Sequence, residues 1–258
     1  MIITALLENT SNRADMQTEH GLSLYIETGT HKILFDMGQT DMFAENAEVL
    51  GIDLSRVDLA ILSHGHYDHG GGLRKFLEIN DRAPVYVSPF AFLPHYNGAE
   101  KYIGLDPALA DHPRIVLTAD TQEIDGSLCL DSCNGRKRTR PLAHFGLTEK
   151  KNGALIPDDF RHEQYLLIEE GGKRILISGC SHKGIFDIAE WFSPDILVGG
   201  FHFSKIPPGA ELEKMAKALA QYPTEFYTCH CTGAAQLEFM CRYMPNLHGL
   251  SCGQRLIL

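Results

Sequence analysis

The sequence predicts an α/β protein, because short apolar segments typical of buried strands lead repeatedly into helical patterns. In three such units the strand is followed by a loop that carries glycine and histidine, and the loop is followed by a helix. The strands of these units are predicted at Val57–Ser63, Arg174–Ser178 and Thr224–Thr228. With 258 residues, of which 44% are hydrophobic, the chain can bury a sizeable core. We expect a single domain over residues 1–258.

The first of these loops holds three imidazoles and one carboxylate in close succession. A glycine run then separates it from a helix that begins near Leu73. On such a loop His64 and His66 can bind one cation, while Asp68 and His69 turn to the other side and bind a second. Neutral imidazole and carboxylate suit Zn²⁺, with Mn²⁺ or Fe²⁺ as competitors for the same ligands. A metal site explains this loop better than packing does.

The pattern His64-x-His66-x-Asp68-His69 resembles the signature of the metallo-β-lactamase superfamily. That resemblance implies an αβ/βα four-layer sandwich with a mononuclear or dinuclear metal site along one edge. The segments around His20 and around residues 34–39 resemble one branch of it. This branch includes a dihydropterin-linked ribofuranosyl-aminobenzene phosphate synthase and proteins described as metal-dependent hydrolases. The resemblance implies the fold and the metal more firmly than the substrate.

Three strands are expected before the loop of residues 64–72, which we call the metal loop: Ile2–Leu7, Leu22–Glu27 and Lys32–Asp36. The second and third of these strands form a hairpin. The resemblance implies that Asp36, at the end of the third strand, lies beneath the metal loop and orients a metal-bound histidine. Alternatively, Asp36 caps the helix expected at Asp41–Leu50. His20 is a candidate for the substrate side of the site.

A helix at Leu73–Ile79 and a strand at Pro84–Ser88 follow the metal loop. Over residues 89–111 prolines and glycines then break every period. We expect an irregular, lid-like insertion over the site. Its aromatic side chains can line a pocket for a ring, or they can simply pack beneath a long loop: Phe90, Phe92, His95, Tyr96 and Tyr102.

A basic segment follows three short strands expected at Ile115–Leu117, Gln122–Ile124 and Ser127–Leu130. It places four cations within five residues of an acidic chain: Arg136, Lys137, Arg138 and Arg140. Arginine presents a bidentate fork to phosphate, so Arg136, Arg138 and Arg140 are candidates for binding an anionic substrate group. The alternative is a solvated surface turn.

The strand Arg174–Ser178 delivers His182 at a glycine-flanked loop, as the first unit does, and His182 is a candidate metal ligand. Many superfamily members end this strand in Gly-Asp, and that aspartate bridges two metals, whereas this chain has Cys180. Cys180 can bind as a thiolate, or His182 can serve in place of the aspartate. The usual preceding histidine of the superfamily is hard to place, with three residues in the right region: Asp158, Asp159 and His162.

Two further strand ends carry histidines. His202 follows a strand at Pro194–Gly200 and is either a substrate contact or a packed residue. His230 follows Thr224–Thr228 and resembles the last metal ligand of the superfamily. Two cysteines flank it and, in an extended strand, would point away from it: Cys229 and Cys231. The remaining elements expected are an amphipathic helix and a last edge strand or tail: Glu211–Tyr222 and Leu256–Leu258.

The candidate ligands form two sets. The first is His64, His66 and His182, and the second is Asp68, His69 and His230. Zinc in such a site, or manganese or iron, lowers the pKa of bound water toward about 7, and Asp68 can serve as both ligand and proton acceptor. The prediction is a metal-dependent hydrolase that uses activated hydroxide on an ester, lactone, amide or phosphoester of a small, anionic, ring-containing substrate.

Two alternatives remain open. One is a transferase that condenses a dihydropterin pyrophosphate with an aminobenzene ribosyl phosphate. The other is a non-catalytic metal-binding protein, an alternative that Cys180 keeps open.

Composition narrows the partners and the location. A net charge of −10 argues against a nucleic-acid footprint. No apolar run is long enough to span a membrane, and the N-terminus reads as a strand rather than a signal peptide, so we expect a cytoplasmic protein. The seven cysteines are expected to be reduced.

Overall fold

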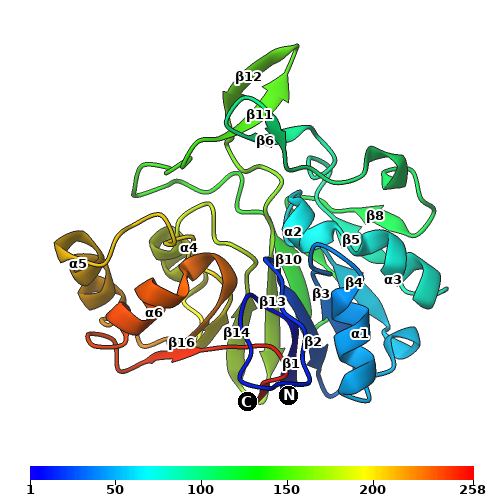
Figure 1. The fold of residues 1–258 in the computed structure, drawn as a ribbon, viewed down its shortest axis with the longest axis horizontal. Coiled ribbons are helices and arrows are strands. Elements are labelled where there is room, and N and C mark those ends of the chain that lie inside the picture. Colours follow the sequence, from blue (N-terminus) through cyan, green and yellow to red (C-terminus); the bar gives the residue numbers. More distant parts are fainter.

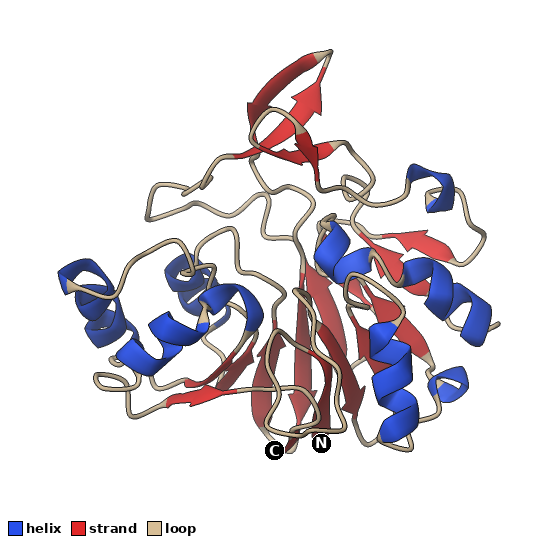
Figure 2. Cartoon of the chain, in the orientation of Figure 1, coloured by secondary structure: helices blue, strands red, loops and turns tan.

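The computed structural model describes all 258 residues and shows two facing sheets with helices on both outer faces (Figure 1 and Figure 2). The first sheet has the order β18-β1-β2-β3-β4-β5-β8. Its strands are β1 (Ile2–Leu7), β2 (Ser23–Glu27), β3 (Lys32–Phe35), β4 (Leu59–Ile61), β5 (Val85–Val87), β8 (Ile115–Leu117) and β18 (Arg255–Ile257). Three helices accompany it: α1 (Met42–Val49), α2 (Tyr67–Gly70) and α3 (Leu73–Ile79).

The second sheet has the order β17-β16-β15-β14-β13-β10-β9. Its strands are β9 (Thr121–Glu123), β10 (Leu128–Asp131), β13 (Tyr165–Glu170), β14 (Lys173–Ile177), β15 (Ile196–Val198), β16 (Glu225–Thr228) and β17 (Leu247–Gly249). Three helices cover its outer face: α4 (Ile185–Phe192), α5 (Ala210–Leu219) and α6 (Ala234–Met240). The four-layer α/β sandwich expected from the sequence is confirmed.

Three hydrophobic clusters fill the three interfaces between these four layers. Because successive side chains of a strand point to opposite faces, each central strand serves two interfaces. On β14, Ile175 and Ile177 belong to the cluster between the sheets, while Leu176 belongs to the cluster beneath α4, α5 and α6. On β3, Phe35 faces the other sheet and Leu34 faces α1. Each fully buried side chain of this size contributes about 1.5–3 kcal/mol to folding.

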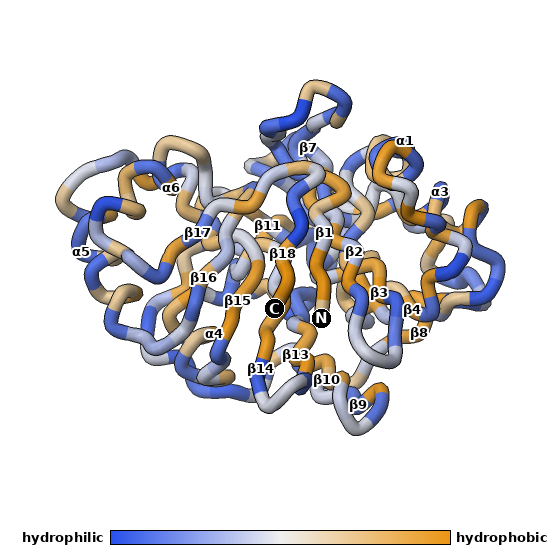
Figure 3. Tube along the Cα trace, turned by 90° about the horizontal axis from the view of Figure 1, so that it is seen from below, coloured by the Kyte–Doolittle hydropathy of each residue, from blue (hydrophilic) through white to orange (hydrophobic).

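The two chain ends meet in the first sheet. Strand β18 pairs antiparallel with β1, with Ile2 opposite Ile257. Figure 3 shows the N and C ends side by side, with the central apolar strands crossing the middle of the molecule. No helix combines the length and the apolar character needed to cross a membrane.

A small third sheet stands above the ends of the two large sheets (Figure 1). Its order is β12-β11-β6-β7, from β6 (His95–Asn97), β7 (Lys101–Tyr102), β11 (Leu147–Lys151) and β12 (Ala154–Pro157). The insertion expected to be irregular over residues 89–111 therefore contains two strands and the short 3₁₀ helix Pro107–Leu109. The sequence pattern did not indicate these strands, because β6 pairs with β11, about fifty residues further along the chain.

Candidate metal centre

The predicted ligands come together at one edge of the sandwich. Strands β3, β4, β14, β15 and β16 run in parallel pairs, and their carboxyl ends meet at this edge. The loop after β4 carries the metal-loop histidines, and the loops after β14 and β16 carry His182 and His230. Such an edge is the usual location of a site in an open α/β sheet.

Asp36 lies beneath the metal loop, fully buried and with backbone φ of 60°. Its Oδ1 accepts the Ser63 N–H at 2.7 Å, and its Oδ2 accepts the Ser63 hydroxyl at 2.7 Å. His69 Nδ1 lies 2.7 Å from the same Oδ2. This contact places the ring proton of His69 on Nδ1 and leaves Nε2 with a free lone pair.

The same reasoning fixes two more imidazoles. His64 Nδ1 lies 2.8 Å from the Ser63 hydroxyl oxygen. His230 Nδ1 lies 2.8 Å from the side-chain oxygen of Asn9. An oxygen acceptor at Nδ1 favours the tautomer that presents an unprotonated Nε2 to the site.

The free nitrogens converge in pairs. His64 Nε2 lies 3.3 Å from His182 Nε2, and His69 Nε2 lies 3.1 Å from His230 Nε2. In the second pair, when both rings are neutral, neither Nε2 carries a proton, and the two lone pairs face each other. A divalent cation resolves this contact, and the donor set therefore fits zinc or a related metal.

The two predicted ligand sets occupy adjacent places. One nitrogen each from His64, His66 and His182 lie within 4.8 Å of one another. Asp68 and His230 form a second group with His20.

Burial favours the neutral form of each of these imidazoles, and at His69 alone another effect outweighs it. It lowers the pKa of His64, His66 and His182 well below the ordinary value, and neighbouring imidazoles lower it further. Burial likewise lowers the pKa of His230 to about 4. For His69 burial acts in the same direction, but Asp36 outweighs it and raises the pKa. Neutral imidazole is the form that binds a metal ion.

Asp68 lies between His230, a member of the second ligand set, and the solvent-exposed ring of His20. Its Oδ2 lies 3.4 Å from His230 Nε2 and 3.2 Å from His20 Nε2. Burial would raise the pKa of Asp68, but the contacts with His20 and His230 outweigh it and lower the pKa well below its usual range. The His20 side chain is 58% exposed, so it connects the buried carboxylate to water.

Cys180 lies between the sets, with Sγ 3.2 Å from His69 Nε2. Burial raises the pKa of its thiol well above the ordinary value. Cys231 also reaches the site and groups with Cys180 and His230, so the expectation that it points away from His230 is wrong. The physical reason is that β16 ends at Thr228 and His230 adopts φ of 49° in a tight 3₁₀ turn, which redirects the following side chain.

Two buried carboxylates that sequence reasoning missed hold the loops of the second sheet. Glu163 accepts the N–H groups of His182 and Lys183 at 2.7 and 3.0 Å. Glu8 accepts the N–H of His230 at 2.6 Å. Glu8 follows β1 directly, as Asp36 follows β3, so a carboxylate directly after a buried strand was the signal that could have identified it.

The pocket lined by His66, Asp68, His182 and His230 is called the metal pocket here. His202 lies between this pocket and a larger cleft. The metal pocket, about 230 Å³, and the cleft, about 520 Å³, are both lined by His182 and His202. Half of the residues that line the cleft are hydrophobic, among them Phe145, Phe186 and Phe201. The His202 ring packs 5.1 Å from that of Phe145, and its Nδ1 is buried without a partner.

The predicted basic segment lies beside this cleft and not in the metal pocket. Arg136 donates to Asp131 at 2.7 Å and to the Trp191 carbonyl at 2.7 Å. Arg138 donates to the carbonyl of Lys183 at 3.0 Å. Arg140 lines the cleft and lies 3.2 Å from Glu190.

Two lysines that the sequence did not single out line the metal pocket itself, Lys101 and Lys205. Lys101 Nζ lies 3.3 Å from the Tyr67 hydroxyl, and Lys205 Nζ lies 2.6 Å from the Phe145 carbonyl. Neither ammonium is within 4.0 Å of a carboxylate, and Asp68 is the one acidic residue that lines this pocket. The mouth of the pocket is therefore positively charged.

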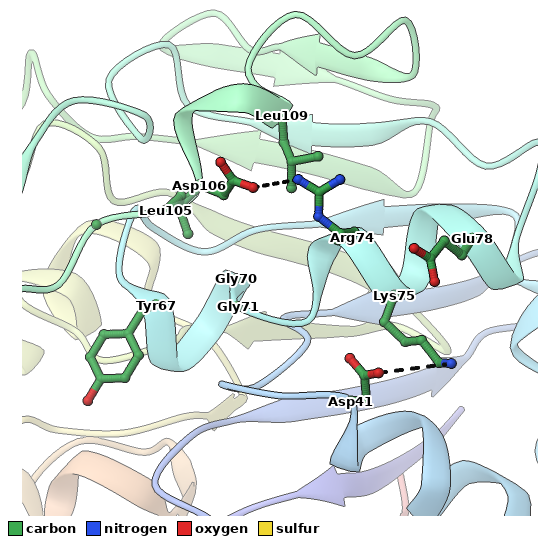
Figure 4. Close-up of a pocket in the computed structure, with 11 residues that line it drawn as sticks. Asp41, Tyr67, Gly70, Gly71, Arg74, Lys75, Glu78, Leu105, Asp106 and Leu109 are labelled. Atoms are coloured by element: carbon green, nitrogen blue, oxygen red, sulfur yellow. Dashed lines mark hydrogen bonds and ion pairs between the residues drawn. The ribbon is translucent and has the colours of Figure 1, made fainter.

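A separate cavity of about 290 Å³ lies beside helices α2 and α3, next to the metal loop (Figure 4). Four of its five charged residues form two pairs: Arg74 lies 2.6 Å from Asp106, and Lys75 lies 4.0 Å from Asp41. None of the predicted metal ligands lines it. This cavity is distinct from the metal pocket.

Comparisons with known proteins agree with this geometry. Residues 17–220 match the family described as the metallo-beta-lactamase superfamily. An uncharacterised protein of Methanocaldococcus jannaschii is 28% identical over 258 residues, covering 96% of this chain and 97% of its own length. From the same organism, 7,8-dihydropterin-6-methyl-4-(beta-D-ribofuranosyl)-aminobenzene-5'-phosphate synthase is 27% identical over 271 residues, covering 92% and 89%. The resemblance to this branch is thereby confirmed.

Solved structures also match the fold of this chain. The crystal structure of Tm1679, a metal-dependent hydrolase of the beta-lactamase superfamily, is 31% identical with a TM-score of 0.83, covering 100% of this chain and 99% of its own. Zn(2+)-bound PqqB from Methylobacterium extorquens shares the fold at 12% identity and a TM-score of 0.60, with 100% of both chains covered. The chain therefore belongs to the metallo-β-lactamase superfamily.

Proposed function

We propose that this protein is a metal-dependent hydrolase acting on an ester, lactone or phosphoester of a small, anionic, ring-containing substrate. The observation that carries the proposal is the pair of facing lone pairs at His69 Nε2 and His230 Nε2, 3.1 Å apart and adjacent to the His64–His182 pair. In this proposal the first ion, zinc by preference, is held by His64, His66 and His182. The second is held by Asp68, His69 and His230, with Cys180 as an additional donor. Ions held there make hydroxide available near neutral pH.

The chain's own residues supply the proton acceptor. Asp68 Oδ2 accepts the proton of the attacking water. Because His20 Nδ1 accepts a side-chain amide N–H, the His20 ring proton lies on Nε2, 3.2 Å from Asp68 Oδ2, and it holds that carboxylate in the charged form that accepts a proton. Asp36, Glu163 and Glu8 hold the ligand-bearing loops before substrate arrives.

The cleft and the lysines support the substrate class. The aromatic walls of the cleft suit a planar ring, and His202 lies where that ring would meet the metal pocket. Lys101 and Lys205 suit a phosphate or carboxylate at the pocket mouth. We assign anion binding to these lysines rather than to Arg136 and Arg138, because the lysines line the metal pocket and the two arginines do not.

Replacing Lys101 or Lys205 with methionine is expected to raise KM for an anionic ester about tenfold and to leave kcat nearly unchanged. A charge-assisted hydrogen bond that forms equally in the ground and transition states contributes about 1.5–3 kcal/mol to binding, and solvent exposure reduces it. The measurement is steady-state hydrolysis of matched anionic and neutral aryl esters. Lys75→Met is the control, because Lys75 lines the separate cavity. Equal KM changes for both esters would contradict the assignment.

A transferase is the second candidate, favoured by the 27% identity to the M. jannaschii synthase over 92% of this chain. In that case the site would stabilise a pyrophosphate leaving group, and the cleft would hold a pterin or an aminobenzene ring. Wild-type protein that binds metal and pterins but hydrolyses no ester, lactone or phosphoester would favour this candidate. Protein that binds metal and neither hydrolyses these substrates nor binds pterins would favour a non-catalytic role.

A further inference from the structure

A cluster of two histidines and an aspartate lies behind the metal loop, outside the two ligand sets. His95, Asp158 and His162 are all fully buried. Asp158 Oδ2 lies 2.9 Å from His95 Nδ1 and 3.2 Å from His162 Nε2. Its Oδ1 accepts the N–H of Phe160 at 2.7 Å. The cluster therefore joins strand β6 of the third sheet to the segment that leads into β13.

His162 extends from this cluster to the metal loop. Its Nδ1 accepts the N–H of Gly65 at 2.9 Å, and Gly65 lies between the candidate ligands His64 and His66. Because Nδ1 accepts, the ring proton lies on Nε2, where Asp158 accepts it. The loop packs closely here, since a Cβ at Gly65 would lie 2.2 Å from the carbonyl oxygen of Ala91. Asp158 thus sets the tautomer of His162, and His162 sets the position of the Gly65 peptide.

His66 faces the same cluster. Its Nε2 is buried and has no hydrogen-bond partner. One ring nitrogen of His66 lies within 4.8 Å of ligand atoms of His95, Asp158 and His162. A metal-bound histidine commonly donates its second N–H to a carboxylate, and Asp158 is the buried carboxylate on this side. Asp36 holds the corresponding position for His69.

The cluster is not itself well suited to bind a cation. The second nitrogen of His95 lies 3.3 Å from the Phe90 carbonyl oxygen, so both ring nitrogens of His95 face oxygen acceptors. Both nitrogens of His162 are also engaged. Burial alone would raise the pKa of Asp158, but His162 and His95 outweigh it and hold the pKa well below the ordinary value, so the carboxylate stays charged.

We propose that Asp158 is a positioning residue for the His64–His66 part of the metal loop. It acts through its hydrogen bond with His162 and through its closeness to the His66 ring, as Asp36 acts on His69. The inference rests on the metal centre of the proposed function but is independent of which reaction that centre performs. It assigns to His95 the task of holding Asp158, and so connects the third sheet to the metal loop.

The test is zinc affinity, measured on chelator-treated protein with a competing chromophoric chelator, together with the visible absorption spectrum of the cobalt-loaded protein. Asp158→Asn is expected to weaken zinc binding about 10–100-fold and to change the cobalt spectrum. The matched control is Asp159→Asn, because the neighbouring Asp159 is 53% exposed and pairs with Arg161. Its zinc affinity and cobalt spectrum are expected to equal those of the wild type.

His162→Gln provides a second variant for the case in which Asp158→Asn does not fold. It is expected to weaken zinc binding in the same direction, with the folded state checked by circular dichroism. Folded Asp158→Asn or His162→Gln protein with wild-type zinc affinity and an unchanged cobalt spectrum would overturn the proposal. Because no turnover is measured, a wild-type protein that binds zinc but hydrolyses nothing would refute the proposed function and leave this inference standing.

Discussion

Replacing Asp68 with alanine, alone or together with His66→Ala, is expected to lower kcat/KM for ester or phosphoester hydrolysis by at least about 10³-fold. In the proposed function His66 is a ligand of the first ion, and Asp68 is both a ligand of the second ion and the proton acceptor beside His20. A positioned general base alone contributes about 10²–10⁴-fold, and loss of a metal ligand adds to that. Steady-state kinetics of the metal-reconstituted variants measures the effect.

Two controls separate this loss from a general effect of truncation. His248→Ala removes an exposed histidine that pairs with Glu225 and does not line the metal pocket. Asp41→Ala removes an exposed carboxylate beside the separate cavity. Both are expected to keep wild-type kinetics. Residual activity of Asp68→Ala within tenfold of the wild type would show that hydrolysis occurs elsewhere.

Asp36→Ala is expected to lower the free energy of unfolding of the metal-free protein by about 3–5 kcal/mol. Three buried donors lose their acceptor: the Ser63 N–H, the Ser63 hydroxyl and His69 Nδ1. Each unsatisfied buried donor costs about 1–3 kcal/mol, and local rearrangement recovers part of the sum. Urea denaturation of chelator-treated protein, followed by circular dichroism, measures the change.

Asp41→Ala again serves as the comparison, since its side chain is 61% exposed. It is expected to change the free energy of unfolding by no more than about 0.5 kcal/mol. A change below 1 kcal/mol for Asp36→Ala would mean that the metal loop does not depend on this carboxylate.

The sequence predicted the fold because local patterns agree with the tertiary structure in the two large sheets. The strand patterns ending at Asp36, Ser63 and Ser178 correspond to β3, β4 and β14, and these are strands whose side chains serve two buried interfaces. The third sheet was not predicted, because β6 and β7 are two or three residues long and β6 pairs with β11 far along the chain. Short strands of this kind depend on non-local pairing more than on pattern.

In the site, the candidate ligands that lie close together in the sequence could be predicted. The buried carboxylates that hold their loops from elsewhere in the chain could not. The metal-loop residues lie within six positions of one another, so their chemistry is visible in one stretch. Glu8 and Glu163 act from distant segments, and nothing in their local sequence states which N–H they accept. Cys231 was missed because an extended strand was assumed where the chain makes a turn at His230.

Metal analysis of the purified protein tests the central claim most directly. After reconstitution with zinc and removal of loosely bound metal, inductively coupled plasma mass spectrometry should find close to two ions per chain. The proposed function assigns one ion to His64, His66 and His182, and the other to Asp68, His69 and His230. Protein that is folded by circular dichroism and yet retains no metal after careful reconstitution would contradict the account.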